Sequence, residues 1–179
     1  MKSIIPMKAV LAAFAVAVIF VSAVQAGEMD MKSLVVRLGF DRLSDQYTCN
    51  GIDISPGIGI QGLNATSLAV IVEDPDAPSG TFTHWLIWNI PPVETIPKAI
   101  AKNATIREPF SAVQGINDFG EVGYAGPCPP PGKPHRYFFR VFGLDSMLDL
   151  PAGSSVNDLE KAMQGHVLQK GEAVATYAR

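Results

Sequence analysis

The chain has 179 residues and a formal net charge of −3 at pH 7, from 14 basic and 17 acidic side chains. It contains no basic stripe, which argues against a general nucleic-acid surface, because neutralising phosphates requires clustered lysines and arginines. The length suits one domain with its own hydrophobic core, and the sequence contains no repeats, low-complexity tracts or internal linkers.

The first 26 residues are predicted to be a cleavable secretory signal peptide. Lys2 and Lys8 precede an apolar run over 9–21, and small residues ending at Ala26 follow it. The alternative is a retained membrane anchor or a lipid attachment. However, the run is shorter than the about 20 residues that span a bilayer, and no cysteine lies at the cleavage point. We therefore expect an exported protein, periplasmic or secreted, whose mature domain covers 27–179 and is not an integral membrane protein.

The chain has two cysteines, Cys49 and Cys128. An isolated pair in an exported protein is commonly a disulfide, and both cysteines lie in turn-like segments that could meet at the surface. Two free thiols are the alternative. No zinc-type spacing of cysteines and histidines accompanies the pair, so the sequence predicts no metal and no cofactor. A zinc site made of two histidines and an aspartate is the alternative.

The distribution of apolar residues predicts mainly strands. Runs rich in aliphatic, β-branched or aromatic residues are expected to form strands at 33–38, 67–72, 82–90 and 136–143. The second of these is apolar at every position after its first, as in a strand buried on both faces. Segment 48–62 is rich in turn-forming residues and is expected to be a loop.

The C-terminal part of the chain is predicted to contain one clear helix. Apolar residues recur at helical spacing between Ser155 and Gln169, and Gly171 would stop the helix. His166 would then lie inside the helix, in a structural role. A last short strand is expected over 173–177.

Residues 114–134 form a segment that is rich in glycine and proline and poor in aliphatic residues. This predicts a loop of about twenty residues inside a small domain, and loops of that length usually carry function.

Three polar clusters stand where predicted strands meet loops: 74–78, 84–85 and 135–137. The first holds two aspartates followed by prolines, which keep the backbone extended, although an Asx-turn is the structural alternative. A single histidine inside an apolar strand, as in the second, is more often a core residue. Taken together, one carboxylate, two imidazoles and glycine N–H groups suit a small anion, above all a phosphate.

These clusters resemble, in order and spacing, the two conserved regions of the phosphatidylethanolamine-binding protein family, also called Raf kinase inhibitor-like. The resemblance runs from about Leu34 to Arg179 and includes 123–130, between the second and third clusters. The bacterial branch of the family is the more similar, on the evidence of 47–51, 115–120 and 162–168.

The resemblance implies a mainly β fold, centred on a β-sheet with a few peripheral helices, one of them near the C-terminus, and a small anion pocket near one surface. The ligand-binding residues that it implies are Asp74, His84, Gly126, Cys128, Pro129, His135 and Tyr137. The supporting residues that it implies are Asp76, Trp85, Pro130 and Arg136. Asp76 is expected to brace the turn or Arg136.

The leading hypothesis is a non-enzymatic module that binds a phosphate-bearing small molecule, such as a phospholipid headgroup or a phosphorylated metabolite. The alternative is an inhibitor or signalling modulator, of the protease or kinase-pathway type, that contacts a protein partner through loop 114–134. Hydrolysis is a third hypothesis, without an evident nucleophile, because Ser79 lies in a turn that lacks the nucleophile-elbow pattern. The sequence leaves the identity of the ligand, any protein partner and a homodimer open.

Overall fold

The structure is a computed structural model that describes residues 32–179, so the predicted signal peptide, 1–26, lies outside the described residues. The described chain forms ten strands, one α-helix and one 3₁₀ helix. The strands are β1 (Lys32–Ser33), β2 (Val35–Arg37), β3 (Ile58–Gln61), β4 (Ser67–Asp74), β5 (Phe82–Ile90), β6 (Thr95–Ile96), β7 (Thr105–Ile106), β8 (Ala112–Gln114), β9 (His135–Leu144) and β10 (Val167–Tyr177). The helices are η1 (Asp45–Tyr47) and α1 (Val156–Met163). Neither helix within 32–179 has the length and apolarity needed to cross a bilayer.

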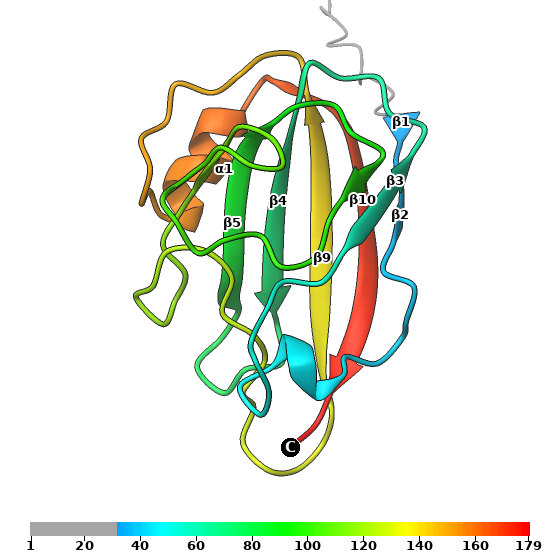
Figure 1. Cartoon of the computed structure of the whole chain (residues 1–179), viewed down its shortest axis with the longest axis vertical. Helices are drawn as coiled ribbons and strands as arrows, with labels where there is room; N and C mark the ends of the chain where they lie inside the picture. Colours follow the sequence, from blue (N-terminus) through cyan, green and yellow to red (C-terminus); the bar gives the residue numbers. More distant parts are fainter. Residues whose placement is uncertain (1–31) are drawn as a thin grey trace, which may run out of the picture.

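Two sheets make up the fold (Figure 1). The larger has seven strands in the order β1-β10-β9-β4-β5-β8-β7, and the smaller has the order β2-β3-β6. One core cluster joins the small sheet to one face of the large sheet, and a second cluster fills the space between the opposite face and α1. The protein is therefore sheet-dominated with one α-helix near the C-terminus, as the sequence predicts.

Strand β4 lies in the middle of the large sheet, between β5 and β9, and is buried along its whole length. Leu68, Val70 and Val72 belong to the cluster under the small sheet, whereas Ala69 and Ile71 belong to the cluster under α1. Because side chains alternate between the two faces of a strand, a strand with both faces covered needs apolar residues at every position. The burial of both faces therefore explains why the sequence of β4 is a nearly unbroken apolar run.

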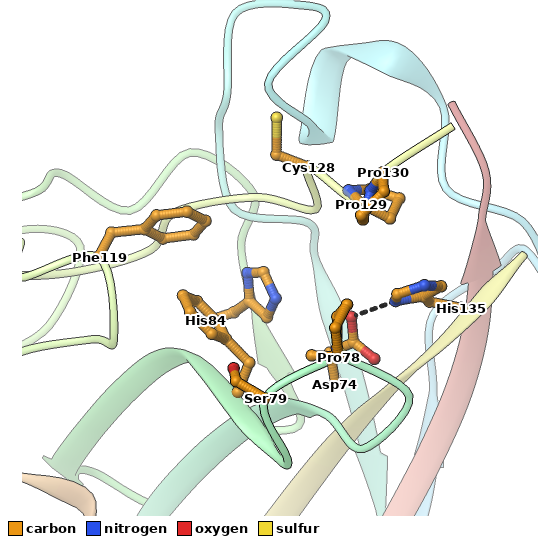
Figure 2. Close-up of a pocket in the computed structure, with 11 residues that line it drawn as sticks. Asp74, Pro78, Ser79, His84, Phe119, Cys128, Pro129, Pro130 and His135 are labelled. Carbon is orange, nitrogen blue, oxygen red and sulfur yellow. Dashed lines mark hydrogen bonds and ion pairs between the residues drawn. The ribbon is translucent and has the colours of Figure 1, made fainter. Parts of the chain in front are cut away.

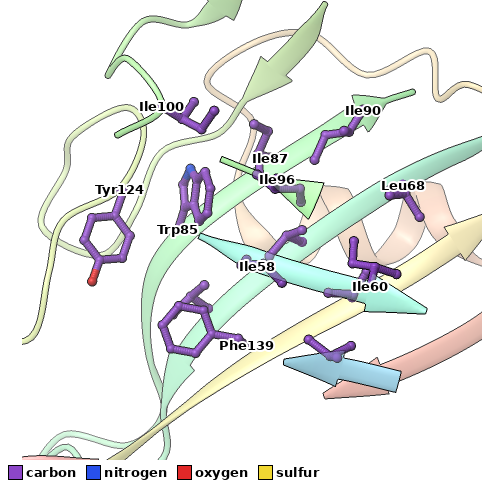
Figure 3. Close-up of a cluster of buried hydrophobic side chains, with 14 of the residues drawn as sticks. Ile58, Ile60, Leu68, Trp85, Ile87, Ile90, Ile96, Ile100, Tyr124 and Phe139 are labelled. Carbon is purple, nitrogen blue, oxygen red and sulfur yellow. The ribbon is translucent and has the colours of Figure 1, made fainter. Parts of the chain in front are cut away.

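The cluster under the small sheet contains most of the largest fully buried side chains (Figure 3). Ile58 and Ile60 of β3 lie in this cluster with Trp85 and Phe139 of the large sheet, and all four side chains are almost fully buried. The indole N–H of Trp85 donates to Oε1 of Gln114 at 2.6 Å. Trp85 is therefore a core residue whose one polar atom is satisfied by Gln114.

The predicted strands are confirmed with small changes of boundary. Segment 82–90 is β5, while β4 and β9 each extend beyond the predicted ends. Segment 33–38 is divided at Leu34, because β1 pairs in parallel with β10 and β2 joins the small sheet. Segment 48–62 is not wholly a loop, since its last residues form β3.

The predicted helix over 155–169 is wrong in its second half. Helix α1 begins after a capping box made by Ser155 and Asp158, and it ends at Met163. The chain then reverses at Gly165, whose φ of 81° is in the left-handed region that favours glycine. Strand β10 follows and pairs with β9 from Leu144 to His135. The pairing with β9 decides the structure here, because cross-strand contacts outweigh a short stretch of helical periodicity.

His166 consequently lies in the turn before β10 and not in a helix. Its Nδ1 lies 2.8 Å from Oδ1 of Asp145, and both side chains are exposed. The expected short strand over 173–177 is the end of the much longer β10.

A disulfide joins Cys49 to Cys128, with 5.4 Å between the two Cα atoms, so the predicted pairing is confirmed. It ties the turn after η1 to the long loop 114–134. The backbone N–H of Cys49 also donates to the carbonyl oxygen of Pro127 at 3.1 Å. The disulfide and this hydrogen bond fasten the two segments together at neighbouring residues.

Candidate functional site

A pocket of about 260 Å³ opens where β4 ends and β9 begins (Figure 2). Its wall combines the turn between β4 and β5, the start of β5, parts of loop 114–134 and the first residue of β9. The lining residues are Asp74, Ala77, Pro78, Ser79, Phe82, His84, Phe119, Cys128, Pro129, Pro130 and His135. His84 and His135 lie on either side of Asp74 (Figure 2).

His84 reaches this pocket because β5 carries a bulge. Val72 pairs with Trp85 and Glu73 pairs with Thr83, so His84 has no partner on β4. In a regular strand His84 would share the face of Leu86, which packs under α1. A bulge bends its strand and turns a side chain in a new direction. The His84 ring instead packs against Tyr137, which belongs to the other core cluster.

Asp74 is placed by the register of β4 and β9. The last residue pair between the two strands is Glu73 with Phe138, and it brings Asp74 beside the first residues of β9. Its Oδ2 lies 2.8 Å from Nδ1 of His135, and its Oδ1 accepts the backbone N–H of Asp76 at 2.8 Å. Because both oxygens of this buried carboxylate are engaged, Asp74 holds the imidazole ring of His135 in one orientation.

The protonation of His84 follows from its one hydrogen bond. Its Nδ1 lies 2.7 Å from the carbonyl oxygen of Ala125, and a carbonyl can only accept, so Nδ1 carries the proton. Burial lowers the pKa of His84, although the bond to Ala125 and nearby carboxylates act in the opposite direction. His84 is therefore neutral at pH 7, with a lone pair on Nε2. Within 32–179 no hydrogen bond to protein engages that atom.

Aromatic rings surround His84 on several sides. The ring centroids of Phe82, Phe119 and Tyr137 lie 5.1, 5.7 and 5.3 Å from that of His84. Phe119 is 48% exposed and forms an apolar edge of the pocket, whereas Tyr137 is 1% exposed. The Tyr137 hydroxyl has no hydrogen-bond partner in the described part of the chain. Burial and the charge of Asp74 raise the pKa of Tyr137, so this hydroxyl keeps its proton.

A sequence model of the phosphatidylethanolamine-binding protein family matches residues 38–178, which include every residue lining the pocket. The chain belongs to the phosphatidylethanolamine-binding protein family. A UPF0098 protein of Pyrococcus horikoshii is 48% identical over 184 residues, covering 100% of this chain and 91% of the relative. A UPF0098 protein of Pyrococcus abyssi is 54% identical over 137 residues, covering 75% of this chain and 77% of the relative.

Two solved structures share the fold. A phosphatidylethanolamine-binding protein homologue from Chlamydia trachomatis superposes with a TM-score of 0.71 at 34% identity, covering 82% of this chain and 97% of its own. Escherichia coli YbcL, described as a member of the mammalian family of these proteins, has a TM-score of 0.74 at 30% identity, covering 82% of this chain and 98% of its own. Both likenesses extend over almost the whole of the two solved chains.

Most of the residues that the family resemblance implies do meet at the pocket. The predicted residues that line it are Asp74, His84, Cys128, Pro129, Pro130 and His135. Tyr137 is not among the lining residues and packs against His84. Gly126 is not among them either, because its N–H donates to Oδ1 of Asp53 at 2.7 Å and is not available to an anion.

Asp76 and Arg136 form an ion pair beside the pocket. The two oxygens of Asp76 accept hydrogen bonds from Nε and Nη2 of Arg136 at 2.8 and 2.7 Å. The Arg136 guanidinium lowers the pKa of Asp76 to about 2. This pair ties the turn after β4 to the start of β9, and neither residue is among those that line the pocket.

Some residues at or near the pocket were given no individual role from the sequence. Ala77 and Pro78 follow the paired aspartates, and Phe119 stands in a segment that carries the family resemblance, so a local signal existed for them. Asp53 had no such signal, because its contact with Gly126 spans 73 residues. In the described residues, no group of three histidine, cysteine or carboxylate side chains is arranged to hold a metal ion.

Proposed function

We propose that the protein is an exported binding module for a small molecule that carries a phosphate ester. The observation that supports this is the pair of histidines in one pocket. His84 and His135 each engage Nδ1 with a protein acceptor, and in residues 32–179 neither Nε2 has a hydrogen-bond partner. Two imidazoles held in this way can meet the oxygens of one anion.

When protonated, His135 would supply the positive charge of the proposed site. As an imidazolium it would donate Nδ1–H to Asp74 and Nε2–H to an anion in the pocket. Hydrogen bonds between charged groups are shorter and roughly twice as strong as neutral ones. Asp74 balances the charge and fixes the ring, so little ordering is left to occur when a ligand binds.

The size and lining of the pocket favour a headgroup-sized ligand. A volume of about 260 Å³ is slightly below the roughly 300–1,000 Å³ of pockets for drug-sized molecules. Phe82, Phe119 and Pro129 form apolar walls, which would contact the carbon chain attached to the phosphate. Phosphoethanolamine has this size and chemistry, and it is the headgroup in the family name.

Replacing His135 with alanine is expected to weaken phosphoethanolamine binding roughly ten- to hundredfold, the value of one hydrogen bond to a charged group. Isothermal titration calorimetry with the mature protein measures this directly. His166→Ala is the matched control, because His166 also lies beside an aspartate, Asp145, but not at the pocket. Equal affinities of the wild type and His135→Ala would contradict the proposal.

The same headgroup could come from a membrane or from solution. Titration of free phosphoethanolamine reports a soluble ligand. Sedimentation with phosphatidylethanolamine vesicles, compared with phosphatidylcholine vesicles, reports a lipid one. If only the titration detects binding, the ligand is a phosphorylated metabolite. If only the vesicles bind the protein, the ligand is the phospholipid.

A binding role is proposed in preference to hydrolysis. Ser79 lines the pocket, but among the described residues no hydrogen bond joins its hydroxyl to His84 or His135. Nucleophilic catalysis by serine requires an adjacent base to activate the hydroxyl.

A protein-contact role is the second candidate. Loop 114–134 exposes two large apolar side chains, Ile116 and Phe119, and exposed apolar residues of this kind are common at binding surfaces. This role predicts no heat from phosphoethanolamine with the wild type, so the titration above distinguishes the two candidates.

Export is part of the proposal, and the disulfide supports it, because disulfides persist mainly in oxidising compartments. We expect the protein recovered from outside the cytoplasm to begin at or near Gly27. N-terminal sequencing checks this. A first residue of Met1, with 9–21 retained, would contradict the cleavage.

A further inference from the structure

The peptide group between Ala125 and Gly126 is held at both of its ends. Its N–H, from Gly126, donates to Oδ1 of Asp53 at 2.7 Å, and its carbonyl oxygen, from Ala125, accepts from Nδ1 of His84 at 2.7 Å. The N–H of Ala125 also donates to the backbone oxygen of His84 at 3.0 Å. A carboxylate, one peptide group and an imidazole therefore form a continuous relay.

This relay sets the chemical character of His84. The negative charge of Asp53 polarises the peptide group, and hydrogen bonds in such a chain strengthen one another. The Ala125 carbonyl becomes a better acceptor and keeps the imidazole proton on Nδ1. The other nitrogen, Nε2, is then left as a proton acceptor on a ring that lines the pocket.

The charged groups around His84 come from several elements. Asp74 faces it from the end of β4, Asp118 from loop 114–134 and Asp53 from the loop before β3, and all three raise its pKa. From β9, the ring of Tyr137 packs on it, and His135 lies across the pocket. Burial outweighs the carboxylates, so the pKa of His84 is lowered and the free protein holds a neutral ring.

We propose that His84 Nε2, set by the Asp53–peptide relay, shares a proton with the bound phosphate, so that the pocket takes up a phosphomonoester together with one proton. This inference rests on the proposed function, since it needs a phosphate in the pocket. It adds the class of ester and a positioning role for Asp53, which acts through the peptide group and does not line the pocket.

The proton is needed because two electron-rich atoms would otherwise face each other. A phosphomonoester has a second pKa of about 6, so at higher pH it is a dianion without a proton to donate. A neutral His84 with its lone pair on Nε2 has none to donate either. Binding above that pKa must therefore take up one proton, and the affinity falls about tenfold for each unit of pH. Below it the ligand already carries the proton and the affinity levels off.

A phosphodiester has no such ionisable oxygen. His84 would have to take the proton from solution and hold it alone, on a ring whose burial opposes the charge. Because burial lowers the pKa of His84, glycerophosphoethanolamine is expected to bind more weakly than phosphoethanolamine. The site would thus prefer a phosphomonoester.

Calorimetry of phosphoethanolamine at about pH 7.5, in two buffers of different ionisation enthalpy, counts the protons taken up on binding. We expect about one proton for the wild type, by the linkage described above. In His84→Asn the amide can still donate to Ala125 but has no second nitrogen, so the uptake is expected to disappear. Uptake that persists in this variant would assign the proton to another group and overturn the inference.

Asp53→Asn keeps an oxygen for the Gly126 N–H and removes the charge from the relay. The affinity at about pH 7.5 is expected to fall, because the charge of Asp53 is one of the groups that favour a protonated His84. Lys102 is the matched control: its Nζ pairs with Oδ2 of Asp53 at 2.6 Å, so Lys102→Met leaves the Asp53 charge in place. The affinity of Lys102→Met for phosphoethanolamine is expected to be unchanged or higher. An equal loss in both variants would contradict the relay.

Nitrogen-15 NMR of the wild type tests the relay without a variant. Free His84 is expected to carry its proton on Nδ1, and Nε2 is expected to gain one when phosphoethanolamine binds. A proton on Nε2 of the free protein overturns the inference. Binding without proton uptake at His84 overturns it and leaves the proposed function standing, whereas no binding at any pH overturns both.

Discussion

Replacing Cys49 and Cys128 together with serine is expected to lower the free energy of unfolding by about 4 kcal/mol, the chain-entropy value for a loop of this length. The disulfide joins residues 79 apart in the sequence. Without it the unfolded chain gains freedom, while the folded chain keeps the backbone bond from Cys49 to Pro127. For a domain of about 150 residues, the melting temperature should fall by roughly 8–16 °C. Urea and thermal denaturation of the oxidised proteins measure both quantities.

The disulfide prediction has a control in the wild type. In excess dithiothreitol the disulfide is reduced, so the free energy of unfolding of the wild type should fall to that of the double-serine variant. If the free energies of unfolding of the oxidised wild type and the double-serine variant differ by less than about 1 kcal/mol, the difference is below that expected for a native disulfide. This result would count against the prediction. Because Cys128 also lines the pocket, the variant should bind phosphoethanolamine more weakly.

Replacing Gly126 with alanine is expected to cost about 3 kcal/mol of stability and to abolish ligand binding. A Cβ at this position would lie 2.2 Å from the backbone oxygen of Tyr47, 2.6 Å from Oδ1 of Asp53 and 2.8 Å from Cα of Thr48. Two of these atoms belong to the backbone and cannot rotate away. The loop must therefore shift, which breaks the Gly126–Asp53 bond and moves the Ala125 carbonyl away from His84.

Gly57→Ala is the matched control for Gly126→Ala. Its added Cβ would make only ordinary contacts, at 3.6 Å from the backbone of Ile96 and Lys98. The loss of stability is expected to stay within about 0.5 kcal/mol. Urea denaturation of both variants measures their stability, and titration with phosphoethanolamine measures their affinity. A Gly126→Ala protein with the stability and affinity of the wild type would show that the close approach at this loop is unnecessary.

The strands of the large sheet could be predicted because burial leaves a local pattern. A strand covered on both faces, such as β4, needs apolar residues at every position, and β5 is rich in β-branched and aromatic residues for a related reason. The end of α1 could not be predicted in this way. Apolar spacing continued past Met163, but the chain from Val167 onward pairs with β9, which lies far away in the sequence.

Some residues of the candidate site could likewise be predicted from the sequence, and others could not. Asp74 and His135 stand at the ends of predicted strands, and a strand end next to a loop is where polar side chains can reach a pocket. His84 was ambiguous, because a histidine inside a strand has no local sign of a bulge. Its direction depends on the register between β4 and β5. Register is set by the packing of both strands and not by either one alone.

The sequence alone determined which chemical groups this protein has and which of its segments are strands or long loops. It also predicted the pairing of its two cysteines, since the chain offers no other pair. The tertiary structure alone decided which nitrogen of His84 is left for a ligand. That nitrogen is Nε2, because Nδ1 lies 2.7 Å from the carbonyl oxygen of Ala125, which is 41 residues away in the sequence. Hydrogen bonds need atoms within about 3 Å, and only the folded chain brings such distant residues that close.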